Sequence, residues 1–168
     1  MYRGKYAQYF TTDIREESTI PGVIQGPVFG LRGARHIPGA NANFGWILIA
    51  KPLFTDKVPH THDGDEYLFF LGGQIPDCFT TFDAEIDFCL GEEQEKCTIT
   101  RPTLVFIPKG LLHTPLNFRV INRPLLFGML LLTARYTKTE QDGRELSYDG
   151  PGVNGASVTI DTPETSRD

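Results

Sequence analysis

The chain has 168 residues and a formal net charge of −5, a length that fits one domain with tails. Its 16 Lys and Arg residues are scattered, which argues against a surface for nucleic acid. The 17 glycines and 12 prolines favour short strands joined by turns over long helices.

No membrane segment is predicted, because the longest apolar run, residues 125–133, is too short to cross a bilayer as a helix. The first residues also lack the apolar core of a signal peptide. We therefore expect a cytoplasmic protein that does not contact membranes.

Residues 1–27 are predicted to form an N-terminal arm that carries aromatic side chains in a polar background. These side chains are Tyr2, Tyr6, Tyr9 and Phe10. Four exposed aromatics in one segment indicate an interaction surface. We expect the arm to pack on a second subunit, and the alternative is that it covers one mouth of its own domain.

The pattern of apolar residues predicts about nine strands in the domain, which we place at residues 28–136. The predicted strands are 28–35, 44–51, 55–62, 66–71, 84–90, 96–101, 103–107, 112–120 and 124–136. Residues 63–65 read as a tight turn, and residues 91–94 as the tip of a hairpin. No amphipathic helix is evident, so the fold class is all-β, as a two-sheet jelly roll or barrel.

Beyond this domain, residues 137–168 are polar and rich in glycine. We expect a C-terminal tail with little to bury. Within it, residues 158–160 are a candidate edge strand.

The three cysteines, Cys78, Cys89 and Cys97, are odd in number and lack a metal-binding spacing. We interpret them as free thiols. A bridge between Cys89 and Cys97 is conceivable across the predicted hairpin, although it would be unusual in a reducing compartment.

Three of the four histidines fall in two short patches that together indicate a metal site. His60 and His62 are two residues apart, so on a strand both imidazoles project to the same side. Glu66 begins the strand that returns from the next turn, and His113 would arrive from a neighbouring strand. Imidazoles bind Fe, Ni, Zn and Cu, and a carboxylate favours harder ions such as Mn and Fe.

The two patches resemble the sequence motifs of the cupins. The first motif, G-x5-H-x-H-x3-E-x6-G, is matched at His60, His62, Glu66 and Gly73. The second, G-x5-P-x-G-x2-H-x3-N, is matched at Pro108, Gly110, His113 and Asn117. The opening glycine of each motif is replaced, by Phe54 and by Pro102, which puts the local strand geometry in doubt rather than the ligands.

The resemblance implies a jelly-roll β-barrel that is usually dimeric, so a homodimer is expected. It also implies one divalent metal ion, held by the equivalents of His60, His62, Glu66 and His113. Iron is the first candidate, and Mn, Ni and Zn are the others.

The pocket around the ion is expected to be apolar. Its predicted wall residues all lie on predicted strands: Trp46, Phe70, Phe106, Phe127 and Met129. A shift of one residue in strand register would turn any of them away.

Several polar residues outside the ligand set are interpreted more simply. His36 is predicted to be a loop histidine, and Asp63 and Asp65 are expected to stabilise their turn. Lys109, Arg119 and Arg123 are candidates to meet an anionic substrate, or are simply solvated.

These features favour a metal-dependent enzyme of the oxygenase type. Its substrate would be a small oxygen-bearing molecule that chelates the ion. A metal-dependent isomerase or lyase is one alternative, and a small-ligand-binding protein without turnover is the other, because fold alone does not decide function.

Overall fold

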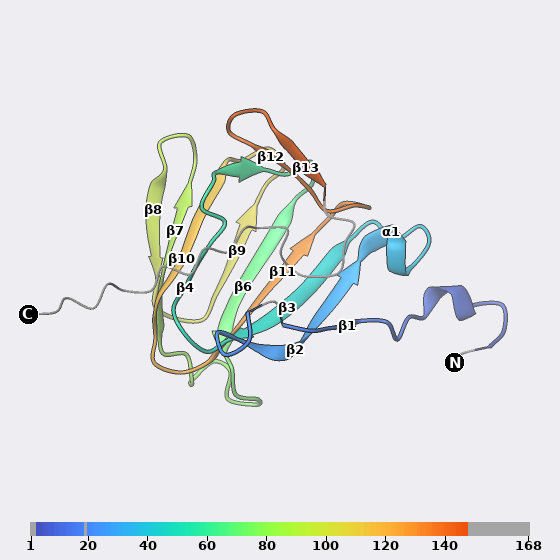
Figure 1. Cartoon of the computed structure of the whole chain (residues 1–168), viewed down its shortest axis with the longest axis horizontal. Helices are drawn as coiled ribbons and strands as arrows, with labels where there is room; N and C mark the ends of the chain where they lie inside the picture. The colour runs from blue at the N-terminus through green and yellow to red at the C-terminus, as the bar shows by residue number, and fades with distance from the viewer. Residues whose placement is uncertain (1–2, 19, 148–168) are drawn as a thin grey trace, which may run out of the picture.

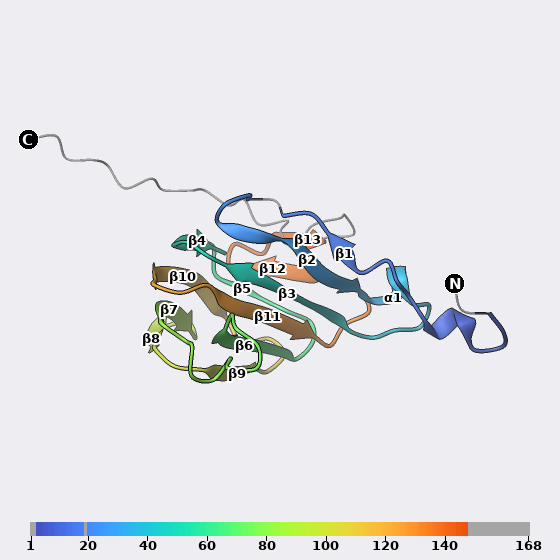
Figure 2. The ribbon, with the colours of Figure 1, turned by 90° about the horizontal axis from the view of Figure 1, so that it is seen from below.

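The computed structural model describes residues 3–18 and 20–147. Its strands form two antiparallel sheets that lie face to face (Figures 1 and 2). One sheet has the spatial order β1 (Arg15–Glu16), β2 (Ile24–Arg32), β3 (Asn43–Ile49), β11 (Leu125–Leu131), β6 (Glu66–Gly72) and β9 (Thr103–Ile107). The all-β jelly-roll prediction is therefore confirmed.

The second sheet has the order β13 (Glu145–Ser147), β12 (Thr137–Glu140), β5 (His60–Thr61), β10 (His113–Ile121), β7 (Ala84–Leu90) and β8 (Glu95–Ile99). A further short strand, β4 (Leu53–Thr55), pairs with β10. We call these the six-stranded and the seven-stranded sheet. Short helical turns, η1 (Ala7–Tyr9) and α1 (Gly33–His36), are the helical elements of the described chain.

The core lies between the two sheets because alternate residues of each strand point inward. In β6, for example, Leu68 and Phe70 are buried, whereas the residues between them are only partly buried. From the opposite sheet, β7 and β10 contribute Phe88 and Phe118, each at most 1% exposed. The rings of Phe70 and Phe118 lie 6.2 Å apart across the interior.

The outer face of the six-stranded sheet is also apolar, and this corrects two predicted pocket residues. Trp46 on β3 is 37% exposed and Phe106 on β9 is 50% exposed, so both point away from the core. Trp46 stacks on Phe29 at 4.1 Å between ring centroids. Gly128 leaves room on this face for the ring of Phe69, because an added Cβ would lie 1.8 Å from its Cζ.

The strand predicted at residues 28–35 corresponds to β2, which begins and ends earlier. β2 starts at Ile24, and residues 33–36 form α1 instead of extending the strand. The Gly26-Pro27 pair does not break β2, because it lies within a register shift between Gln25 and Phe29. Such irregularities accommodate proline, which has no N–H to donate to the ladder.

The predicted strand 55–62 is not continuous, because β4 ends at Thr55, β5 begins at His60, and residues 56–59 separate them. The φ of Asp56 is +43°, a left-handed conformation that interrupts the extended chain. The predicted last strand, 124–136, is shorter in the structure and ends at Leu131.

The start of the predicted tail belongs to the fold, because β12 and β13 form a hairpin that extends the seven-stranded sheet. Lys138 and Glu140 are buried, and each is paired with an opposite charge, Asp56 and Arg144 respectively. These ion pairs allow a polar sequence to pack against the barrel. Polar composition alone therefore predicted a tail where the structure has a hairpin. The candidate edge strand 158–160 lies outside the described residues.

The three cysteines are free thiols, as interpreted from the sequence, and Cys97 is exposed. Cys89 lies opposite Lys96 and Cys97 opposite Phe88 in the β7–β8 hairpin, so the conceivable bridge is not formed. Within residues 3–18 and 20–147, no helix is long and apolar enough to span a membrane.

Candidate metal centre

The four predicted ligands come together between the two sheets. His60 lies on β5 directly opposite His113, the first residue of β10. His62 follows β5 by one residue. Glu66 begins β6 in the facing sheet, so the site joins both layers of the barrel. The turn between β5 and β6 returns the chain from one sheet to the other, which is how residues four positions apart face each other.

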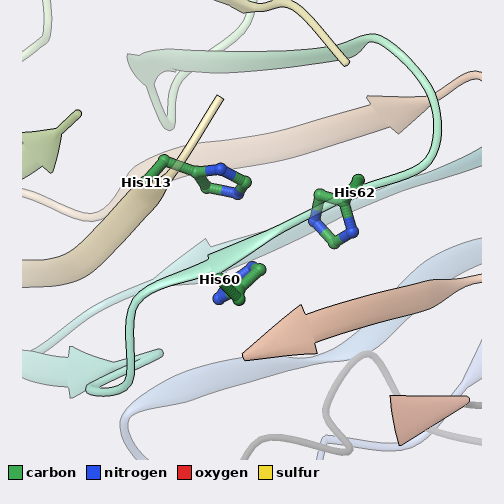
Figure 3. A group of neighbouring side chains, drawn as sticks. All are labelled: His60, His62 and His113. Atoms are coloured by element: carbon green, nitrogen blue, oxygen red, sulfur yellow. The ribbon is translucent and has the colours of Figure 1, made fainter. Parts of the chain in front are cut away.

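The three imidazole rings are buried and turned toward a common space (Figure 3). Their centroids lie 4.5 Å apart for His60 and His113, 4.9 Å for His60 and His62, and 5.1 Å for His62 and His113. One nitrogen from each ring lies within 4.8 Å of the others. This spacing suits three ligands of a single ion.

Each ring is held by a backbone carbonyl on the side away from this space. Nδ1 of His60 lies 3.2 Å from the carbonyl oxygen of Val58, Nδ1 of His62 lies 2.6 Å from that of Thr137, and Nδ1 of His113 lies 2.9 Å from that of Leu111. A carbonyl only accepts, so each neutral ring carries its proton on Nδ1. Every Nε2 is then left as an acceptor, the form in which histidine binds metals.

The carboxylate of Glu66 lies beside two of these nitrogens and also indicates a cation site. Its Oε2 lies 3.3 Å from Nε2 of His113 and 3.7 Å from Nε2 of His62. Neither of these buried nitrogens has a hydrogen-bond partner among the described residues. Unprotonated nitrogens and a carboxylate oxygen all present lone pairs, which repel unless a proton or a cation lies between them. Buried polar atoms without partners are rare, and a divalent metal ion satisfies all of them.

Burial also keeps the rings of His60 and His62 neutral. It lowers the pKa of His60 from its usual 6.5 to about 2, with His113, His62 and Lys138 adding to the effect. The hydrogen bond to Val58 acts in the opposite direction. Burial likewise lowers the pKa of His62, against the opposing charge of Glu66. Neutral imidazole is the form that coordinates a metal.

The two turns that carry the ligands are tied to each other. Asp65 Oδ1 accepts a hydrogen bond of 2.8 Å from the backbone N–H of Lys109. The N–H of Gly110 donates to the carbonyl of His62 at 3.1 Å, and Gly110 has φ +80°, which favours glycine. Asp65 thus links the two turns. Asp63 is exposed and lies 3.5 Å from the Lys109 ammonium.

A cavity of about 60 Å³ adjoins the ligands, and we call it the metal cavity. Phe127 and Met129 line it as predicted, whereas Phe70 lies behind Phe127 with the two ring centroids 5.1 Å apart. Trp46 and Phe106 are on the outer face and take no part. The other apolar lining residues are Ile47, Leu53, Leu68, Leu116 and Phe118.

Sequence reasoning missed several polar lining residues, above all Arg32, Thr55, Asp56 and Tyr136. None of them belongs to a motif. Their only signal was position, because Arg32 ends an apolar strand and Asp56 interrupts one.

The basic residues proposed from the sequence do not reach the cavity. Arg119 forms ion pairs with Glu85 and Asp87, and Lys109 with Asp63. Arg123 is exposed. His36 is not in a loop, since it ends α1, where its Nδ1 accepts a hydrogen bond of 3.2 Å from the N–H of Arg32.

The lowered pKa values of His60 and His62 predict a pH-dependent stability of the metal-free protein. Below about pH 6.5 these histidines bind protons in the unfolded chain but stay neutral in the folded chain, so the free energy of unfolding decreases as pH falls. The stability that the neutral rings contribute is present in full above about pH 6.5. Below that pH it is lost at about 1.4 kcal/mol per pH unit for His60, and His62 adds to the loss. Urea unfolding between about pH 7.5 and about pH 5 measures it, before most carboxylates titrate.

His60→Gln should show a shallower slope by about one proton, whereas His36→Gln should match the original protein. A stability that stays constant across this range would contradict the burial of neutral rings.

Sequence comparison identifies no relatives, since no protein-family profile matches the chain and neither does any curated protein. The fold does have matches among solved structures. An oxalate oxidase in complex with the substrate analogue glycolate is 14% identical, over 76% of this chain and 60% of that chain, with a TM-score of 0.48. An oxalate decarboxylase is 9% identical, over 76% and 30%, with a TM-score of 0.50.

Vicilin from hazelnut, Corylus avellana, is 15% identical, over 84% of this chain and 36% of that chain, with a TM-score of 0.47. The chain thus spans about three fifths of the oxalate oxidase and about a third of the other two. At such identities the likeness concerns the fold. The chain is therefore similar in fold to these solved structures, and its two histidine motifs resemble those of the cupins.

Proposed function

We propose that the protein is a metal-dependent enzyme of the oxygenase type that acts on a small oxygen-bearing molecule. The observation that carries this proposal is the set of three acceptor Nε2 atoms beside the Glu66 carboxylate. Three neutral ligands and one anion leave a divalent ion with net positive charge. Four protein ligands also leave about two positions for a substrate if the ion is six-coordinate.

The residues of the chain define what the site can hold. A bound divalent ion supplies Lewis acidity and, when it is iron or manganese, redox chemistry. The apolar lining, with Leu68, Phe118 and Phe127 among its members, excludes bulk water from the reacting groups. The backbone carbonyls of Val58, Thr137 and Leu111 hold the imidazoles in one orientation, so the ligands need little rearrangement.

Asp56 is the candidate for proton transfer. Apart from Glu66, it is the only carboxylate in the described part of the chain that lines the metal cavity. Its Oδ1 lies 3.2 Å from Nζ of Lys138, so a proton can be held or passed at this pair. Its left-handed backbone is uncommon for a residue other than glycine and is found at functional positions.

Two alternatives use the same centre. An isomerase or lyase would use the ion only to polarise a carbonyl, and Asp56 would then serve as its base. A binding protein would keep the ion without turnover, and its cavity of about 60 Å³ would suit only a very small ligand.

Removal of a ligand should release the metal. His60→Ala and His113→Ala are each expected to weaken metal affinity by at least about 100-fold, since loss of a residue that only orients a ligand already costs about 10–100-fold. Elemental analysis of the purified proteins measures the content. His36→Ala is the matched control, because this histidine lies outside the site and should leave the metal in place. Full retention in both ligand variants would refute the assignment.

Turnover decides between the three functions. The iron-loaded protein should consume dioxygen with a small diketone, catechol or hydroxy acid, and the reaction should stop without oxygen. Asp56→Asn should then lower kcat by about 10²-fold or more with metal content unchanged, as expected for loss of a proton-transfer group. Turnover that persists anaerobically would favour the isomerase or lyase. No turnover of any member with the metal in place would favour the binding protein.

A further inference from the structure

An arginine lines the metal cavity. Arg32 ends β2 and, within residues 3–18 and 20–147, is the only arginine or lysine that lines this cavity. It is 9% exposed, and Glu16 on β1 holds it through two contacts, 3.1 Å from Nε to Oε1 and 2.7 Å from Nη2 to Oε2. Such a bidentate pair fixes the plane of the guanidinium.

The ion pair occupies only one edge of this guanidinium. Nε and Nη2 face Glu16, whereas Nη1 makes no hydrogen bond to any described residue. An arginine has five N–H donors in a rigid fork. The two on Nη1 therefore have no acceptor among the described residues.

Arg32 also lines a second, larger cavity of about 270 Å³, which we call the arginine cavity. The two cavities share Arg32 and Tyr136, so these side chains form the boundary between them. The remaining lining residues are Ala34, Arg35, Asn43, Ala134 and Arg135. Among the described residues that line it, three of seven are arginines and none is acidic, although the chain as a whole carries a net charge of −5.

The walls of the arginine cavity are joined by the backbone. The N–H of Ala34 in α1 donates to the carbonyl of Ala134, at 3.2 Å. Gly33 makes this approach possible, because its φ is +40° and an added Cβ would lie 2.3 Å from that same carbonyl oxygen. The arginines at 35 and 135 are thus carried by two segments held together at one point.

We propose that the arginine cavity is the entrance to the metal cavity and that it selects small organic anions. A carboxylate would be attracted by the three arginines and bound by Nη1 of Arg32. The other end of the same molecule, bearing an oxygen donor, would face the histidines. This inference rests on the proposed function and specifies the substrate class of that site.

Size limits the ligand further. A cavity of about 60 Å³ holds on the order of five waters, given about 10–15 Å³ for each. The ligand portion that reaches the histidines has therefore only about five non-hydrogen atoms. Small hydroxy or oxo carboxylates meet both the charge and the size requirement.

Glycolate and glycolamide test the proposal, because they match in size and differ in charge. In titrations of the metal-loaded protein followed by NMR, glycolate should bind at least about 10-fold more tightly, as expected for a charged partner of a buried arginine. Arg135→Gln should lower the affinity for glycolate about 2- to 5-fold and make it less dependent on salt concentration. The affinity for glycolamide should not change. Arg101→Gln, an exposed arginine outside both cavities, is the matched control and should change neither.

The double variant Glu16→Gln/Arg32→Gln removes the buried pair without leaving a single buried charge. It should abolish the preference for glycolate. Equal binding of glycolate and glycolamide by the original protein would overturn the proposal. So would a response of Arg135→Gln identical to that of Arg101→Gln.

Repeating the titration without metal separates this inference from the proposed function. The metal-free protein should still prefer glycolate to glycolamide, although more weakly, because this preference depends on the arginines. If elemental analysis finds metal but neither the metal-loaded nor the metal-free protein prefers glycolate, the proposed entrance is refuted and the metal centre is not. If the protein binds no metal, the metal-free titration still tests the proposed entrance.

An independent observation concerns the outer face of the six-stranded sheet. The outward side chains of β3, β6 and β9 include Phe44, Trp46, Tyr67, Phe69, Leu104 and Phe106. Leu104 is 66% exposed, and none of these six residues is charged. A contiguous exposed apolar surface of this kind marks an interaction site.

We infer that a second copy of the chain covers this face. Strands spaced about 4.8 Å apart and rising about 3.4 Å per residue give the four strands from β3 to β9 an area of roughly 400 Å² in projection. A stable interface buries about 800 Å² per partner, so further surface is needed. The N-terminal segment extends away from both sheets in Figures 1 and 2, with Tyr6, Tyr9 and Phe10 more than half exposed, and supplies that surface from the same chain.

Sedimentation velocity tests the dimer. The original protein should have twice the chain mass of 18.8 kDa, and the Leu104→Glu variant should have the mass of one chain. Ile75→Glu is the matched control, because Ile75 is 88% exposed in the loop after β6, and should leave the dimer intact. Deletion of residues 1–12, which spares β1 and Glu16, should weaken the dimer without abolishing it. A monomeric original protein, or a Leu104→Glu dimer of unchanged stability, would refute the inference.

Discussion

The hydrogen bonds from three backbone carbonyls to three imidazole Nδ1 atoms are the constraint on which the site depends. They decide which nitrogen of each ring carries the proton, and so leave three lone pairs and a carboxylate pointing into one buried space. Such an arrangement is electrostatically unfavourable without a cation. The barrel makes it stable enough to persist, because the ligands come from both sheets and the packed core between the sheets fixes their separation.

The motifs made it predictable that these four side chains lie together. Alternation along a strand placed His60 and His62 on one side, and the pairing of β5 with β10 then brings His113 opposite His60. The apolar runs likewise located the strands that make up the core. Both inferences rest on local periodicity, which sequence reports directly.

Sequence could not reveal features that depend on contacts between distant segments. Trp46 and Phe127 look alike as aromatic residues on apolar strands, yet one is outside the barrel and the other lines the metal cavity, because both faces of this sheet are apolar. Lys138 and Glu140 looked like tail residues until their partners, Asp56 and Arg144, were located. Arg32 belongs to no motif, and only the structure places it between the two cavities.

The carbonyl of Thr137 gives the β12–β13 hairpin a consequence for the limits of the domain. This oxygen holds the ring of His62, and β12 is the sheet neighbour of the two-residue strand that carries His60. A protein truncated after residue 136 would keep all four candidate ligands but lose the carbonyl that sets the tautomer of His62. The smallest unit that preserves the geometry of this site therefore ends later than the last hydrophobic strand.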